Sequence, residues 1–149
     1  MFAKNRKSLA QNFLAKVHLA RSIVRESSIN HDDIVYEIGP GKGILTEELG
    51  RRAKQVIAVE KDAFLYSGLR LRFARSENIV LHNADFLQFS IRERCYKVFA
   101  NVPFNITAAV VRKLIQCRNR PTEAYLIVQR EAAERFTGVP GTTQVSVLL

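Results

Sequence analysis

Short apolar runs alternate with helix-like segments along most of the chain. Five runs rich in β-branched and aromatic residues lie at 34–38, 55–60, 78–81, 96–100 and 125–128. Such nearly continuous apolarity is typical of strands buried on both faces of a sheet. The segments 44–54, 63–75, 107–118 and 131–136 have helical patterns, with Asp62 and Thr107 as candidate N-caps. The alternation predicts an α/β fold, with helices on both faces of a mostly parallel sheet.

Another amphipathic helix is predicted ahead of the sheet, over residues 16–28. Val17, Ala20, Ile23 and Val24 share one face of it, and we expect that face to pack on an edge of the sheet. Residues 1–8 then form a basic N-terminal arm. A chain of 149 residues is enough for one domain with a hydrophobic core, but too short for two.

Composition excludes several classes of protein. No apolar run approaches the ~18–20 residues of a membrane span, and no secretory signal is evident, so a soluble cytoplasmic protein is expected. Cys95 and Cys117 lack the spacing of metal ligands, and the three histidines stand alone. We therefore predict no metal site and expect both cysteines to be buried thiols.

Positive charge is concentrated in two places. The formal net charge is +9, and six basic residues precede Glu26 with no acidic residue among them. A second acid-free stretch, between Glu93 and Glu123, holds Lys97, Arg112, Lys113, Arg118 and Arg120. A solvated surface would explain either cluster alone, but together they favour contact with nucleic-acid phosphates. Lys4, Arg6, Lys7, Arg112 and Lys113 are the candidate RNA-binding residues.

A glycine-rich loop follows the first predicted strand. Its sequence, Gly39-Pro40-Gly41-Lys42-Gly43, leads directly into a helix. Glycines there allow a tight bend and a close ligand, while the helix N-terminus offers free N–H groups. The G-x-G-x-G spacing departs from the dinucleotide fingerprint G-x-G-x-x-G, which would need a third glycine at Ile44. The loop predicts a nucleotide-like ligand, with a purely structural turn as the alternative.

Two carboxylates follow the next two predicted strands. Glu60 ends the second strand, where an acidic side chain can accept hydrogen bonds from both hydroxyls of a ribose. Asp85 follows the third strand, where a carboxylate could meet an adenine amino group. An exposed strand-end carboxylate and a plain Asx turn are the respective alternatives.

The segment Asn101-Val102-Pro103-Phe104 follows the fourth predicted strand. An exocyclic amine on an aromatic base is a poor nucleophile because its lone pair is delocalised into the ring. The Asn101 side-chain oxygen and the Val102 carbonyl can accept hydrogen bonds from both of its N–H groups. Pro103 fixes the backbone, and Phe104 offers a ring on which a base can stack. These four residues are the candidate catalytic residues.

Taken together, the motifs resemble the S-adenosylmethionine-dependent ribosomal RNA adenine N6-methyltransferases, which include Erm-type macrolide-resistance enzymes and dimethyladenosine transferases. The similarity extends from Gln11-Asn12-Phe13-Leu14, through the loop and strand-end motifs, to Val128-Gln129-Arg130-Glu131. It implies a Rossmann-like methyltransferase fold, S-adenosylmethionine as cofactor and ribosomal RNA as partner of a monomeric enzyme. The implied cofactor-binding residues are Gln11, Asn12, Leu14, Gly39, Gly41, Glu60, Lys61, Asp85, Phe86 and Asn101.

Within that family, residues 134–138 and 142–146 look more like the Erm-type enzymes that act on large-subunit (23S) RNA. We therefore expect adenine N6-methylation of 23S RNA, giving macrolide-lincosamide-streptogramin resistance, with a small-subunit (16S-type) dimethyladenosine transferase as the alternative.

Family members continue with further strands and a small helical domain, whereas this chain stops inside the apolar run 145–149. We expect residues 1–149 to be an incomplete cofactor-binding catalytic domain that alone binds the cofactor weakly and does not turn over RNA.

Two other classes of function stay open at this stage. A non-catalytic RNA-binding relative could keep the fold and the pocket, although the intact segment 101–104 argues against it. A nicotinamide-dependent enzyme could use a similar sheet, but the glycine spacing disfavours it.

Overall fold

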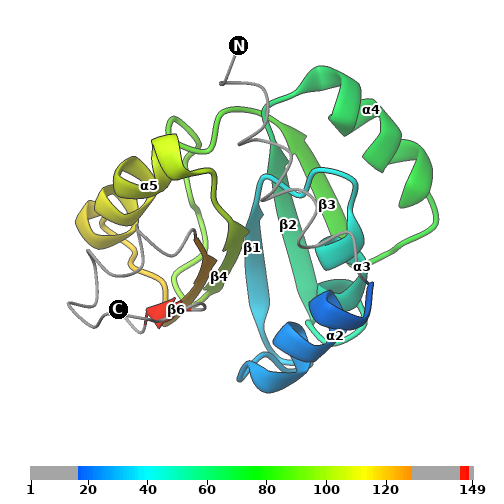
Figure 1. Ribbon diagram of the computed structural model, residues 1–149, viewed down its shortest axis with the longest axis horizontal. Coiled ribbons are helices and arrows are strands. Elements are labelled where there is room, and N and C mark those ends of the chain that lie inside the picture. The colour runs from blue at the N-terminus through cyan, green and yellow to red at the C-terminus, as the bar shows by residue number, and fades with distance from the viewer. Residues whose placement is uncertain (1–16, 129–144, 148–149) are drawn as a thin grey trace, which may run out of the picture.

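A single twisted sheet organises the part of the chain that the computed structural model describes, residues 17–128 and 145–147 (Figure 1). Its strand order is β3-β2-β1-β4-β5-β6, with β6 antiparallel to β5 and the other neighbours parallel. The strands are β1 (Ile34–Ile38), β2 (Gln55–Glu60), β3 (Ile79–Asn83), β4 (Lys97–Asn101), β5 (Glu123–Ile127) and β6 (Val145–Val147). The helices are α2 (Val17–Glu26), α3 (Ile44–Gly50), α4 (Ala63–Arg72) and α5 (Phe104–Gln116). The mostly parallel α/β sheet expected from the sequence is confirmed.

Each face of the sheet carries its own hydrophobic cluster, because successive strand side chains point to opposite faces. On one face, Val35 and Phe99 pack with residues of α2 and α3. On the other, Tyr36 and Val98 pack with Val110 and other residues of α5. The helices therefore cover both faces. No helix within the described ranges is long and apolar enough to cross a membrane.

Helix α2 covers a face of the sheet rather than an edge. Ala20 and Val24 are buried in the same cluster as Val35, Val56 and Phe99. The helical period was predicted correctly, but the expected packing on a sheet edge was wrong. Val17, which was assigned to the same apolar face, is 45% exposed at the start of the helix.

Helix α5 begins three residues earlier than its predicted start. Its N-cap is Pro103, and the Thr107 hydroxyl does not cap the helix but donates to the Pro103 carbonyl oxygen at 3.1 Å. That is a bond back to the preceding turn, which a threonine inside a helix can make. The consequence is that Phe104 opens the helix. The helix predicted over 131–136 lies outside the described residues.

Asp62 caps α4, as predicted. Its carboxylate accepts hydrogen bonds from the backbone N–H groups of Phe64 at 2.8 Å and Leu65 at 3.0 Å. We expect Asp62→Ala to lower the free energy of unfolding by about 1 kcal/mol, because two N–H groups lose their acceptor. Urea denaturation would measure this, with Asp32→Ala as the control, since Asp32 is exposed and outside any helix. Equal losses in the two variants would contradict the assignment.

The carboxyl ends of the central strands meet at one edge of the sheet. Ile38 pairs with Val59 of β2 and with Ala100 of β4, and Glu60 pairs with Asn83 of β3. The chain leaves β1 toward β2 on one side, whereas β4 lies on the other side of β1. Ligands of open α/β sheets bind at such a switch point.

Candidate functional site

The glycine loop between β1 and α3 adopts a backbone that only glycine accommodates easily. Gly39, Gly41 and Gly43 have φ values of 65°, 59° and 80°. A Cβ at Gly43 would lie 2.7 Å from Phe73, so this glycine lets α4 pack against the start of α3. A Cβ at Gly39 or Gly41 would meet nothing within 4 Å. The loop is therefore open on the side of these two glycines, where a ligand could approach the backbone.

Glu60 is held beside this loop at the end of β2. One carboxylate oxygen accepts from the Gly41 N–H at 3.1 Å, and the other accepts from the Asp62 N–H at 2.8 Å. The residue is only 7% exposed. Both contacts fix the orientation of the carboxylate, and its remaining lone pairs suit the two adjacent hydroxyls of a ribose.

Asp85 lies at the same edge, after β3, and both of its carboxylate oxygens already have partners within the protein. One oxygen accepts from Leu87 N–H at 2.9 Å, which is the Asx turn weighed as an alternative, and the other pairs with Lys61 Nζ at 2.7 Å. The Lys61 contact, helped by the Leu87 N–H, lowers the pKa of Asp85, which keeps it ionised. An adenine amino group would have to share this carboxylate. The neighbouring Phe86 ring is buried in the core, so it does not form a stacking surface in the site.

The segment 101–104 completes the edge at the end of β4. Asn101 is the last residue of the strand, and the Val102 N–H donates to the Ile127 carbonyl at 2.9 Å. Pro103 has a φ of −59°, and Phe104 is 49% exposed at the start of α5. The structure thus brings this segment to the edge that carries the glycine loop and Glu60, with an aromatic ring presented outward.

Glu37 is a residue to which the sequence analysis gave no role. It is 1% exposed as the second-last residue of β1, and burial raises its pKa to about 8; the Thr46 side chain of α3 opposes the rise, and the charge of Glu60 adds to it. Glu37 Oε2 and the Thr46 hydroxyl otherwise have no hydrogen-bond partner among the described residues. The signal in the sequence was a single carboxylate inside an otherwise apolar strand directly before the glycine loop.

We expect Glu37 to make stability depend on pH. A carboxyl whose pKa is raised to about 8 on folding binds a proton more tightly in the folded state, so stability is lost as pH rises from about 4.5 to 8. Glu37→Gln removes that loss and is expected to be more stable than the wild type at pH 8, by on the order of a few kcal/mol. Urea titrations of both proteins at about pH 4.5 and pH 8 measure the difference in free energy of unfolding. A pH-independent gap between the two proteins would contradict the neutral Glu37.

The residues of this edge fit S-adenosylmethionine. Gly39 and Gly41 leave room for the cofactor, and Glu60 presents a carboxylate suited to its ribose. Gln11, Asn12 and Leu14 lie outside the described residues.

In the described part of the chain, no group of three or more His, Cys, Asp or Glu side chains could hold a metal ion. Cys95 is exposed and Cys117 is half-buried, so the expectation of two buried thiols was wrong.

Two lysines of the second basic stretch point inward rather than toward a ligand. Lys113 Nζ donates to the carbonyls of Phe86, Leu87 and Phe89, which ties α5 to the segment after β3. Lys97 is buried in an ion-pair network. Arg112 is exposed on α5, whereas Lys4, Arg6 and Lys7 lie outside the described residues. We therefore leave Lys113 out of any RNA-binding surface.

Comparisons with known proteins agree with this geometry. A sequence profile of the family described as ribosomal RNA adenine dimethylase matches residues 2–149. The chain is 35% identical to ribosomal RNA small subunit methyltransferase A of Caldanaerobacter subterraneus, an alignment covering 97% of this chain and 57% of the relative. It is 38% identical to the probable small subunit methyltransferase A of Methanopyrus kandleri, covering 96% and 51%. The chain thus spans about half the length of these relatives.

Solved structures show the same fold. The crystal structure of 23S rRNA methyltransferase ErmE matches with a TM-score of 0.76 and 32% identity, over 81% of this chain and 49% of that one. A dimethyladenosine transferase from Plasmodium falciparum matches with a TM-score of 0.71 and 30% identity, over 79% and 43%. The Rossmann-like S-adenosylmethionine-dependent methyltransferase fold is confirmed. Sequence, fold and strand-end motifs agree, and the chain belongs to the ribosomal RNA adenine dimethylase family.

Proposed function

We propose that the protein methylates N6 of an adenine in small-subunit ribosomal RNA, with S-adenosylmethionine as methyl donor. The observation that carries this proposal is the position of Asn101-Val102-Pro103-Phe104 on the same sheet edge as the glycine loop and Glu60. The family assignment supports the reaction class. The names of the relatives favour small-subunit RNA, and therefore the alternative weighed from the sequence rather than 23S methylation with antibiotic resistance.

The chain's own residues would prepare the amine for attack. Phe104, half-exposed at the start of α5, offers a ring on which the extruded adenine can stack. The Asn101 side-chain oxygen and the Val102 carbonyl would accept the two N6 hydrogens, which localises the nitrogen lone pair. Pro103 holds this turn at a fixed φ. The role of these residues is positioning rather than covalent catalysis.

The cofactor, when bound, supplies a methyl group on a positively charged sulfur. Glu60 and the glycine loop would hold it beside the segment that carries Asn101. Transfer of the methyl group to N6 would leave the bonding electron pair on sulfur, and N6 would release a proton to water. A second transfer to the same nitrogen would follow the same geometry, and the family description as a dimethylase favours it.

A large-subunit target is the second candidate, because the ErmE structure matches at 32% identity. The segments that favoured a large-subunit target in the sequence, residues 134–138 and 142–146, are described only at 145 and 146 and so add nothing in its favour. An enzyme of either kind works where ribosomes are assembled, so the expected cytoplasmic location belongs to the same proposal.

Transfer of a labelled methyl group to protein-free ribosomal RNA tests the reaction. The whole protein is expected to label small-subunit RNA more strongly than large-subunit RNA, and calorimetry is expected to show binding of S-adenosylmethionine but not of NAD. Tight RNA binding without labelling would favour the non-catalytic alternative instead.

A further inference from the structure

The sheet has a second functional candidate at its opposite edge, where β4 and β5 begin. Four exposed arginines flank these strand starts, namely Arg92 and Arg94 before β4, and Arg118 and Arg120 before β5. None of the four makes an ion pair or a side-chain hydrogen bond with another residue in the described ranges. Of the four, the sequence analysis named Arg118 and Arg120, as part of the second acid-free stretch.

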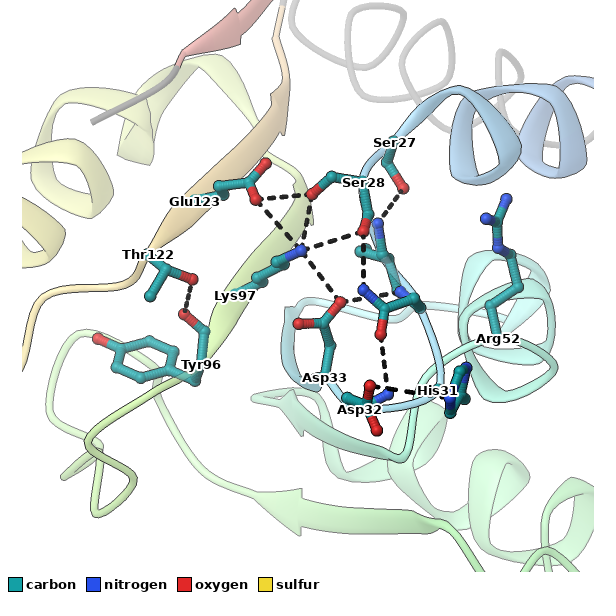
Figure 2. A network of polar contacts seen from close by, with 12 residues as sticks. Ser27, Ser28, His31, Asp32, Asp33, Arg52, Tyr96, Lys97, Thr122 and Glu123 are labelled. Atoms are coloured by element: carbon teal, nitrogen blue, oxygen red, sulfur yellow. Dashed lines mark hydrogen bonds and ion pairs between the residues drawn. The ribbon is translucent and has the colours of Figure 1, made fainter.

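The two arginine-bearing segments run side by side, although they are distant in sequence. The Thr122 N–H donates to the Tyr96 carbonyl at 2.8 Å, and the Thr122 hydroxyl donates to the same oxygen at 3.1 Å (Figure 2). The Tyr96 hydroxyl donates to the Asn119 carbonyl at 2.6 Å. These bonds hold the segment that ends at Tyr96 against residues 119–122, so the four arginines lie on two neighbouring segments at this end of the sheet, which we call the arginine edge.

A hollow adjoins the arginine edge. The connection from β3 to β4, residues 84–96, contains no helix, so the outer part of this sheet face is covered only by a loop. A cavity of about 430 Å³ lies there, lined by Tyr36, His82, Phe89, Ser90, Arg92 and Glu93 among others. The His82 and Phe89 rings are 5.0 Å apart, and Arg92 belongs to both the hollow and the edge.

The charges around the hollow favour an anionic polymer with planar groups. Among the described residues that line it, Glu93 is the one acidic side chain, and it accepts a hydrogen bond from the Tyr36 hydroxyl. Guanidinium groups suit phosphates, and aromatic walls suit an unstacked base, whose edges could bond to His82 and Ser90. A small metabolite would use the hollow but would not need four arginines beside it.

We propose that the arginine edge and its hollow form a second binding site for single-stranded RNA, with phosphates on the arginines and one unpaired base in the hollow. That the polymer is ribosomal RNA rests on the proposed function. The site lies at the amino ends of the strands, about 13 Å from Asn101 along the four residue steps of β4. It would therefore hold a part of the substrate other than the target adenine.

The salt dependence of RNA binding tests the arginine edge. We compare the whole wild-type protein with R92Q/R94Q/R118Q/R120Q, using a fluorescent single-stranded RNA between about 50 and 200 mM KCl without cofactor. The slope of log K against log salt is expected to fall by roughly 2 to 3, at about 0.7 per lost phosphate contact. The matched control, R51Q/K54Q/R70Q/R75Q, removes the same charge from exposed residues outside both basic stretches and should change the slope by less than about 1. Equal slope changes in the two variants would overturn the proposal.

The hollow is tested by Ser90→Trp, because Ser90 lies exposed at its rim and an indole there would fill it. Binding of a base-bearing strand is expected to weaken roughly tenfold, while binding of an abasic strand stays unchanged. His82→Ala, which removes one ring from the wall, should also weaken binding of the base-bearing strand. Ser67→Trp on α4, which does not line the hollow, should leave the binding of both strands unchanged. Unchanged affinity in both hollow variants would overturn the base site.

The two proposals fail differently. If the wild type transfers no methyl group but the arginine variants still lose salt dependence, the proposed function fails and the second site stands. If methyl transfer is normal and the arginine variants bind RNA as the wild type does, the second site fails alone.

Discussion

Replacing Lys97 with methionine is expected to lower the free energy of unfolding by about 3 kcal/mol, because two carboxylates lose a shared cation. The Lys97 ammonium lies 3.0 Å from Asp33 Oδ2 and 3.1 Å from Glu123 Oε1, and it donates to the Ser28 hydroxyl at 2.7 Å (Figure 2). Its side chain is only 9% exposed. The network joins the loop before β1 to the first residues of β4 and β5.

The same contacts keep Lys97 charged. Burial acts to lower its pKa, but the hydrogen bonds to Asp33 and Glu123 outweigh burial and raise the pKa above its ordinary value. Urea denaturation measures the loss in Lys97→Met, and Lys42→Met serves as the control because Lys42 is exposed. Adding Asp33→Asn and Glu123→Gln to Lys97→Met is expected to recover part of the loss. A loss below about 0.5 kcal/mol, the usual size at surface sites, would contradict a structural role for the network.

The inward orientation of Lys97 could not be predicted from the sequence. The pattern of residues 96–100 predicted a strand, and the structure has one at 97–101. The same pattern could not show that Lys97 turns inward, because the Ser28 group it binds lies 69 residues away. An acid-free stretch therefore looked like one basic surface, whereas Lys97 and Lys113 are internal and the segment after α5 is bonded to Tyr96.

Strand-end motifs were easier to predict, because the carboxyl ends of parallel strands must share an edge. Glu60 and Asn101 were placed at strand ends from the sequence, and both are there. The start of α5 was harder to predict. A threonine at 107 matches the N-cap preference, but the fixed φ of Pro103 allows the helix to begin directly after it.

Asn101→Ala is expected to reduce the rate of methyl transfer about 100-fold to 1000-fold, with little change in affinity for S-adenosylmethionine. The reason is that an oriented acceptor for one N6 hydrogen is lost at the step where the nitrogen lone pair becomes available, and losing one such preorganised group typically costs this much. Single-turnover rates and calorimetry on the same preparation separate the two effects. Asn101→Asp, which keeps a side-chain oxygen, should retain more activity than the alanine variant.

Phe104→Leu provides the comparison within the same segment. It keeps an apolar side chain at the start of α5 but removes the ring face, and stacking is worth roughly 1–3 kcal/mol per base. Weaker RNA binding is therefore expected in Phe104→Leu, with a smaller effect on single-turnover rate at saturating RNA. If Asn101→Ala transferred methyl groups at the wild-type rate, the assigned role of the β4 terminus would be wrong.

The proposed role of this chain, as the catalytic edge of a ribosomal RNA adenine N6-methyltransferase, is tested by mapping methylated adenines. Mass spectrometry would locate them in both ribosomal RNAs after reaction with the whole protein and S-adenosylmethionine. We expect N6-methyladenine or N6,N6-dimethyladenine at defined positions of small-subunit RNA, absent with Asn101→Ala. Methylation confined to large-subunit RNA would contradict the choice of substrate, and the absence of any N6-methylated adenine would contradict the function itself.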